Sequence, residues 1–196
     1  NMLPKQESFM LESWLKAYSF SINETVIEVV ALPGVFSQNR LDIGTQVLLE
    51  NVPKKISGDL LDFGCGAGVI ASYYGKVFPN VNLHLLDVSA LALYSAQETL
   101  KLNHLTGRIF PSNSLSDVQG KYDYVISNPP FHQGLKTNYQ ATETFLSKIK
   151  PHLKPRGQVT VVANSFLRYQ PIMEEEIGRT KILAKQKGFS LYHCSL

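Results

Sequence analysis

Residues 122–131, YDYVISNPPF, hold the clearest structural signal in this chain of 196 residues. Val125 and Ile126 favour a buried β-strand. Two consecutive prolines then end that strand, because neither has an N–H to donate to a neighbouring strand and both have a fixed φ. Asn128 is therefore predicted to lie on a stiff backbone at the carboxyl end of a strand. In open α/β sheets, ligands bind at this end of the strands.

The side chain of Asn128 suits a planar ligand that carries an NH2 group. Its amide oxygen and the carbonyl oxygen of Pro129 can each accept one hydrogen of the amine, and Phe131 can cover the flat face of the ligand. The same residues also fit a simple strand-terminating turn, since Asn-Pro and Pro-Pro are common in loops. A second motif, upstream, favours the ligand-binding interpretation.

Residues 62–68, DFGCGAG, form a glycine-rich loop between a predicted strand and a predicted helix. Glycines permit a tight turn and let a ligand approach bare backbone, and the first helical turn offers free N–H groups. Asp87 closes the next predicted strand, 19 positions after Gly68. An acidic residue at that place suits the two hydroxyl groups of a ribose.

The spacing of the glycines argues against a dinucleotide as the ligand. The dinucleotide fingerprint is Gly-x-Gly-x-x-Gly, whereas this chain has Gly-x-Gly-x-Gly with Asp62 two residues before the first glycine. An aspartate at that position can face an ammonium group, directly or through water. A ribose combined with a cationic amino-acid end describes S-adenosylmethionine, which we therefore expect as the cofactor.

Predicted strands and helices alternate from residue 59 onward, which favours an α/β fold with a mostly parallel sheet and helices on both faces. The predicted strands are 60–63, 81–86, 107–110, 121–127 and 158–163, and the predicted helices are 68–77, 90–102, 140–150 and 171–177. Residues 180–185 and 189–196 read as a C-terminal antiparallel hairpin at one edge of the sheet.

The region before residue 59 is predicted to contain a helix at 9–18, a β-hairpin at 19–32 and a second helix at 41–52. In the second helix, Ile43, Val47 and Leu48 form the expected apolar stripe, and Asp42 lies near the start.

Composition and charge exclude several classes of protein. No apolar run approaches the roughly 20 residues that span a bilayer, and no signal peptide is evident, so we expect no membrane and a cytoplasmic location. Two cysteines and five scattered histidines give no disulfide framework and no metal-ligand spacing, so we expect no metal. The formal net charge of +3 permits nucleic acid as a partner without requiring it.

The order of the three motifs resembles the class I S-adenosylmethionine-dependent amino-methyltransferases, from roughly residue 35 to the C-terminus. That resemblance implies a Rossmann-like fold with a seven-stranded sheet. A closer similarity, to the ribosomal RNA small-subunit methyltransferase C family, rests on residues 33–37 (PGVFS), 41–45 (LDIGT), 87–90 (DVSA), 112–113 (SN) and 127–132 (SNPPFH). It implies methylation of the exocyclic N2 amine of a guanine in 16S rRNA, free or in the small ribosomal subunit.

The resemblance also implies a role for each motif residue. The methionine end of the cofactor would be held by Asp62, Gly64, Cys65 and Gly66, and the ribose by Asp87. The adenine would lie between the Val88-Ser89 backbone and the loop with Ser112 and Asn113. The base to be methylated would be held by Asn128, Pro129, Pro130 and Phe131, and Asn128 would also contact the cofactor. The Phe36 loop and Thr45 would close over the cofactor.

The family has an additional N-terminal domain, most of which this chain lacks. Because residue 1 is Asn, we expect the chain to be the catalytic half of a longer protein whose missing N-terminal half is a partner. Residues 1–34 are then an N-terminal helix and hairpin extension, and residues 35–196 form the catalytic domain.

Other functions also fit parts of the pattern. The Asn-Pro-Pro-Phe motif does not separate guanine N2 from adenine N6 in RNA or DNA, cytosine N4 or the N5 of protein glutamine, because all present an NH2 on a planar group. A nicotinamide-dependent oxidoreductase is disfavoured by the glycine spacing. A non-catalytic RNA-binding domain is disfavoured by the presence of Asp62, Asp87 and Asn128 together.

Overall fold

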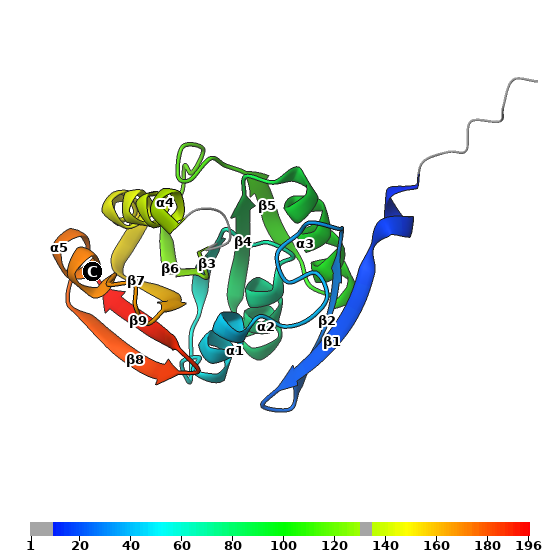
Figure 1. Ribbon diagram of the computed structural model, residues 1–196, viewed down its shortest axis with the longest axis horizontal. Coiled ribbons are helices and arrows are strands. Elements are labelled where there is room, and N and C mark those ends of the chain that lie inside the picture. The colour runs from blue at the N-terminus through cyan, green and yellow to red at the C-terminus, as the bar shows by residue number, and fades with distance from the viewer. Residues whose placement is uncertain (1–9, 130–134) are drawn as a thin grey trace, which may run out of the picture.

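A seven-stranded sheet runs through the middle of the molecule, with helices on both of its faces (Figure 1). The computed structural model describes residues 10–129 and 135–196. The strand order is β5-β4-β3-β6-β7-β9-β8, and the first five of these are parallel while β9 is antiparallel to both its neighbours. The strands are β3 (Gly58–Phe63), β4 (Val81–Asp87), β5 (Gly107–Pro111), β6 (Tyr122–Ser127), β7 (Leu153–Asn164), β8 (Thr180–Gln186) and β9 (Phe189–Ser195). The predicted mostly parallel sheet with a C-terminal antiparallel hairpin is confirmed.

The chain changes direction across the sheet between β3 and β6. From β3 it proceeds outward through β4 to β5 and then returns to β6 on the other side of β3. Asp62 in β3 pairs with Ile126 in β6, so the loops that follow these two strands leave the sheet side by side. A crevice at such a switch point is the usual ligand site of an open α/β sheet.

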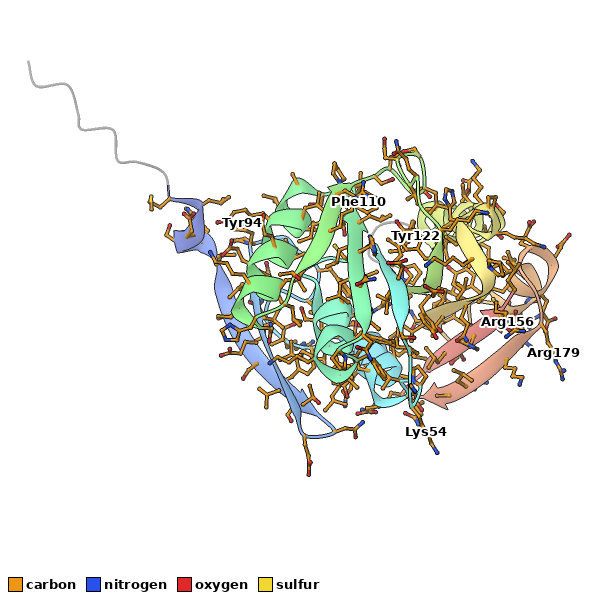
Figure 2. The ribbon with its side chains drawn as sticks, turned by 180° about the vertical axis from the view of Figure 1, so that it is seen from behind. Lys54, Tyr94, Phe110, Tyr122, Arg156 and Arg179 are labelled. Atoms are coloured by element: carbon orange, nitrogen blue, oxygen red, sulfur yellow. The ribbon has the colours of Figure 1, made fainter. Side chains whose placement is uncertain are left out.

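Two hydrophobic cores, one on each face, hold the helices to the sheet. One face carries α1 (Ile43–Glu50), α2 (Val69–Val77) and α3 (Ala90–Leu102), and the other carries α4 (Leu135–Lys148) and α5 (Gln170–Glu176). Adjacent strand residues point to opposite faces, so Leu60 lies in the first core and Leu61 in the second, both fully buried. Side chains fill the space on either side of the sheet (Figure 2).

The N-terminal hairpin forms a separate two-stranded sheet, as predicted. Its strands are β1 (Lys16–Ile22) and β2 (Thr25–Ala31), and the turn residues Asn23 and Glu24 have φ of 48° and 66°. Two successive residues with positive φ are typical of the tight turns that match the twist of a hairpin. In Figure 1 the hairpin lies along α3, at the end of the molecule away from β8.

Side chains of α3 bond to the outer edge of β2 in place of another strand. The Asn103 side chain accepts from the N–H of residue 28 at 3.1 Å and donates to the carbonyl of residue 28 at 2.7 Å. The Thr99 hydroxyl accepts from the N–H of residue 30 at 3.2 Å and donates to the carbonyl of residue 30 at 2.9 Å. Ser95 accepts from the N–H of Leu32 at 3.0 Å. Four residues of a helix rise about 6 Å, which is close to the length of two residues of a strand. Side chains four residues apart on the helix can therefore bond to every second residue along the strand.

Several predicted boundaries and one buried position are wrong. The predicted helix at 9–18 is a short 3-10 turn, Leu11–Trp14, followed by β1 from Lys16, because pairing of Lys16 with Ala31 extends the hairpin beyond the alternating segment. Ile43 is half exposed, because α1 begins there and its buried face runs through Gly44, Val47 and Leu48. The helix predicted at 140–150 begins at residue 135, and β7 begins at 153 rather than 158.

Within residues 10–129 and 135–196, no helix is both long enough and apolar enough to cross a bilayer. In the same ranges, no three His, Cys, Asp or Glu side chains lie close enough together to hold a metal ion.

Candidate functional site

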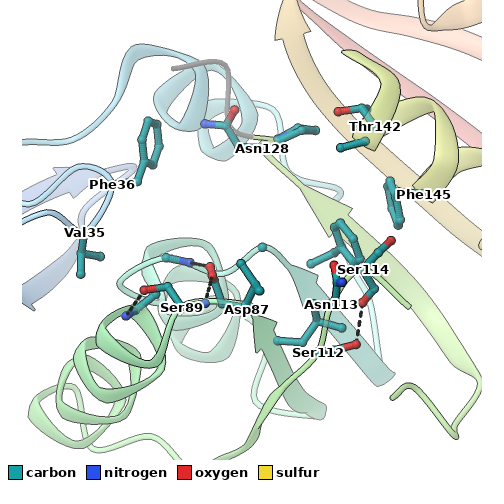
Figure 3. A pocket seen from close by; sticks show the side chains of 18 of the residues that line it. Val35, Phe36, Asp87, Ser89, Ser112, Asn113, Ser114, Asn128, Thr142 and Phe145 are labelled. Carbon is teal, nitrogen blue, oxygen red and sulfur yellow. Dashed lines mark hydrogen bonds between the residues drawn. The ribbon is translucent and has the colours of Figure 1, made fainter. Parts of the chain in front are cut away.

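A cavity of about 330 Å³ opens at the switch point of the sheet (Figure 3). Its walls come from the loops that follow β3, β4, β5 and β6, from residues 34–36 and from α4. These segments are far apart in the sequence, and the parallel strands bring them to one edge. The cavity therefore lies where the sequence predicts a ligand.

Asp87 lines the cavity at the end of β4. One of its carboxylate oxygens accepts from the N–H of Gly66 and the other from the N–H of Ser89, both at 2.9 Å. A carboxylate offers about four lone-pair positions, and these two bonds use one on each oxygen. Asp87 is thus held rigidly with acceptor capacity left for two hydroxyl groups.

The glycine-rich loop forms the floor between β3 and α2. Gly64 and Gly66 line the cavity, and the N–H of Cys65 bonds to the carbonyl of Leu86 at the end of β4. Gly68 precedes α2 with φ of 77°, and a Cβ there would lie 3.2 Å from the backbone of Ala96. A side chain here would strain the backbone and crowd Ala96, so glycine lets α2 approach α3 closely.

Asp62 lies beneath the loop and does not line the cavity. It is 1% exposed, one oxygen accepts from the N–H of Ala71 at 3.0 Å, and the other oxygen has no hydrogen-bond partner. Burial, with a smaller contribution from the charge of Asp87, raises the pKa of Asp62 to about 7. Any contact between Asp62 and a ligand in the cavity therefore needs an intermediary such as water.

Cys65 also lies outside the main cavity. It borders a smaller space of about 20 Å³, which shares Gly64, Gly66 and Asn128 with the cavity and also reaches Thr45. Burial, and then the charges of Asp62 and Asp87, raise the pKa of the Cys65 thiol well above its usual value. The thiol is therefore not a nucleophile at neutral pH.

The side of the cavity beyond Asp87 contains the residues predicted to bind adenine. Val88 is largely exposed, and Ser89 is the N-cap of α3, with its hydroxyl accepting from the N–H of Ala92 at 3.3 Å. The Ser112 hydroxyl donates to the carbonyl of residue 114 and accepts from the N–H of residue 117, so it shapes the loop. Asn113 lines the cavity and is exposed.

Asn128 lies across the cavity from Asp87 (Figure 3). It is 8% exposed, and its amide nitrogen donates to Asp42 Oδ2 and to Thr45 Oγ1, each at 2.9 Å. Its amide oxygen is therefore the group left for a ligand. Pro129 also lines the cavity, while Pro130 and Phe131 lie outside the described residues.

One wall, formed by α4, is absent from the sequence-based prediction. It consists of Ala141, Thr142 and Phe145, which recur at helical spacing on one face. The fully buried Phe145 stacks on Phe63 with ring centroids 3.9 Å apart. The sequence predicts a helix here, but it gives no sign that one face of this helix borders a ligand.

Comparisons with known proteins show which family the chain resembles. The model of the methyltransferase small domain family matches residues 26–193. A ribosomal RNA small subunit methyltransferase C from Colwellia psychrerythraea is 57% identical over 188 residues, and one from Aeromonas hydrophila is 49% identical over 186 residues. These matches cover 96% and 95% of this chain but 53% and 54% of the relatives.

Among solved structures, a 16S rRNA N2 methyltransferase from T. thermophilus in complex with AdoMet and guanosine superposes with a TM-score of 0.82 at 25% identity. The superposition covers 97% of this chain and 53% of that protein. The chain thus spans about half the length of these relatives. Because the family model matches most of the chain, the chain belongs to the methyltransferase small domain family.

Proposed function

We propose that this chain is the catalytic part of an S-adenosylmethionine-dependent methyltransferase that acts on the exocyclic N2 amine of a guanine in 16S rRNA. The observation that carries the proposal is the amide of Asn128, which is held across the cavity from Asp87 with its oxygen left to accept. The relatives named as rRNA methyltransferases support the same substrate.

The residues of the cavity fit S-adenosylmethionine. Asp87 has acceptors for both ribose hydroxyls, and the backbone of Gly64 and Gly66 is open to the methionine end. Asp62 would meet the ammonium group through water, since its unpartnered oxygen is buried and Asp62 does not line the cavity. Asn113 and the Val88-Ser89 backbone would border the adenine. The bound cofactor supplies an activated methyl group on a positively charged sulfur.

The protein contributes orientation of the acceptor amine. The lone pair of an exocyclic amine is delocalised into the base, so the nitrogen is a poor nucleophile. If Asn128 Oδ1 and the Pro129 carbonyl each accept one N–H, the nitrogen becomes more pyramidal and its lone pair points toward the methyl group. Such positioning is worth several orders of magnitude in rate, and the product sheds its extra proton to water without a strong base.

A base in folded RNA must leave its stack to reach this cavity. The net charge of +3 is small for binding RNA without help, since affinity rises with the number of phosphates neutralised. The relatives are about twice as long as the segment that matches this chain, and we propose that sequence corresponding to their unmatched part supplies most of the RNA affinity. A ribosomal substrate would place the reaction in the cytoplasm.

Methyl transfer from labelled S-adenosylmethionine to 16S rRNA, small ribosomal subunits, tRNA, DNA and protein, followed by nucleoside and amino-acid analysis, tests the proposal. We expect N2-methylguanosine in 16S rRNA. Methylated adenine, cytosine or glutamine as the product would instead support one of the alternative amines. Calorimetry tests the cofactor: we expect the Asp87→Ala variant to bind S-adenosylmethionine at least tenfold more weakly than the wild type. Tighter binding of NAD than of S-adenosylmethionine by the wild type would overturn the proposal.

A further inference from the structure

We infer that Asp42 and Thr45, at the start of α1, are positioning residues that turn the Asn128 amide so that it presents only an acceptor to the substrate amine. The inference rests on the proposed function. Neither residue needs to touch the substrate or the cofactor in this role. They act through Asn128, from which they are separated by more than 80 positions in the sequence.

An asparagine amide can be turned in two ways that have almost the same shape, so its neighbours decide which end faces a ligand. Asp42 Oδ2 and Thr45 Oγ1 both lie 2.9 Å from the amide nitrogen. An ionised carboxylate has no hydrogen to donate, so the amide nitrogen must face Asp42. The amide oxygen then faces away, toward the cavity.

The two bonds use both N–H groups of Asn128. The amide consequently has no donor left for a ligand and can bind a ligand only by accepting. An NH2 group on a planar ring satisfies this requirement, whereas a carbonyl oxygen in the same place would face another acceptor. Asp42 and Thr45 would thereby help to select an amine over a ketone at the reacting position.

Helix α1 holds the two residues in a fixed relation. Asp42 is the N-cap, and its Oδ2 also accepts from the N–H of Thr45 at 2.9 Å. A Cβ on Gly44 would lie 3.1 Å from this same oxygen and 2.9 Å from the ring of Phe189, so the space beside it is already filled. Val47, Leu48 and Leu49 bury the helix in the core, which makes the arrangement rigid.

Two substitutions test the inference without removing the helix cap. Asp42→Ser keeps a good N-cap but is too short to reach Asn128, and Thr45→Val keeps the shape of Thr45 without an acceptor. We expect each to lower kcat for methyl transfer at least tenfold, with the Kd for S-adenosylmethionine within twofold of wild type. Asp42→Asn, which can still cap and accept, should retain most of the activity. Wild-type kcat in both Asp42→Ser and Thr45→Val would overturn the inference.

A reciprocal exchange tests the direction of the hydrogen bond. Asn128→Asp places two carboxylates against each other and should be nearly inactive. Adding Asp42→Asn removes one of the two charges and lets an amide N–H face the carboxylate, although the N–H of Thr45 then loses the cap bond that it makes to the same oxygen. The double variant should therefore recover only part of the lost activity, at least fivefold over Asn128→Asp. A double variant no better than the single one would contradict the assignment.

The side-chain NH2 signals of Asn128 give a readout that does not depend on activity. In 15N-labelled protein they can be assigned by their loss in Asn128→Ser. We expect both protons to exchange slowly with solvent in the wild type and at least one to exchange much faster in Asp42→Ser. If the wild type transfers no methyl group to any substrate, the proposed function fails, while these signals still decide the inference. Unchanged exchange in Asp42→Ser would overturn it.

Discussion

Asp62 illustrates how a single buried carboxyl group links the cofactor loop to stability. Its raised pKa has a definite consequence for the dependence of stability on pH. The pKa is about 7 in the folded protein and about 3.9 in an unfolded chain. Between these values the unfolded chain has lost the proton while the folded protein keeps it. Stability should therefore fall as pH rises from about 4 to 7, and the loss is complete above pH 7.

We predict that Asp62→Asn removes this loss. The variant should gain stability over the wild type as pH rises, by an amount on the order of 4 kcal/mol at pH 8 and near zero at pH 4. Denaturant unfolding at several pH values measures the difference. Asp117→Asn, which removes an exposed carboxyl, is the control and should show no such trend. Parallel pH profiles for wild type and Asp62→Asn would contradict the assignment of a raised pKa.

At the scale of elements, α3 has two functions, one at its N-terminus and one on a face. Its N-terminus follows Asp87 and Ser89 at the cavity, and its side chains bond to the edge of β2. The sequence predicts α3 and the hairpin separately, with the Ser89 cap at the right place. It does not predict their contact, because serine, threonine and asparagine on a helix usually indicate a solvated face.

The contact between α3 and β2 predicts that replacing Thr99 with valine, which has nearly the same shape, will clearly lower stability. Thr99→Val leaves both the N–H and the carbonyl of Val30 without their side-chain partner in a partly buried place. We expect a loss of about 2–4 kcal/mol in the free energy of unfolding, from two unsatisfied groups. In Thr144→Val, the lost bond is an exposed one within α4, and the change should stay below about 0.5 kcal/mol. Equal effects of the two changes on urea unfolding would show that the contact adds no stability.

For the whole molecule, the sequence predicts the features that local chemistry determines. The strands, the glycine loop, Asp87 and Asn128 follow from periodicity, prolines and spacing, and the structure brings the last three to one cavity. The α4 wall and the bonds from α1 to Asn128 were not predicted, because both depend on how distant helices pack on the sheet. The prediction of a helix at residues 9–18 is wrong for a related reason, because pairing with β2 extends the first strand.

The central claim is that cofactor binding and orientation of the amine belong to opposite sides of one cavity. The most direct test is Asn128→Ala, with S-adenosylmethionine affinity measured by calorimetry and methyl transfer to 16S rRNA measured on the same folded protein. We predict cofactor affinity within about threefold of wild type, a difference under about 1 kcal/mol, and a rate of transfer lower by at least a hundredfold. A folded Asn128→Ala protein that transfers methyl groups at the wild-type rate would contradict the account.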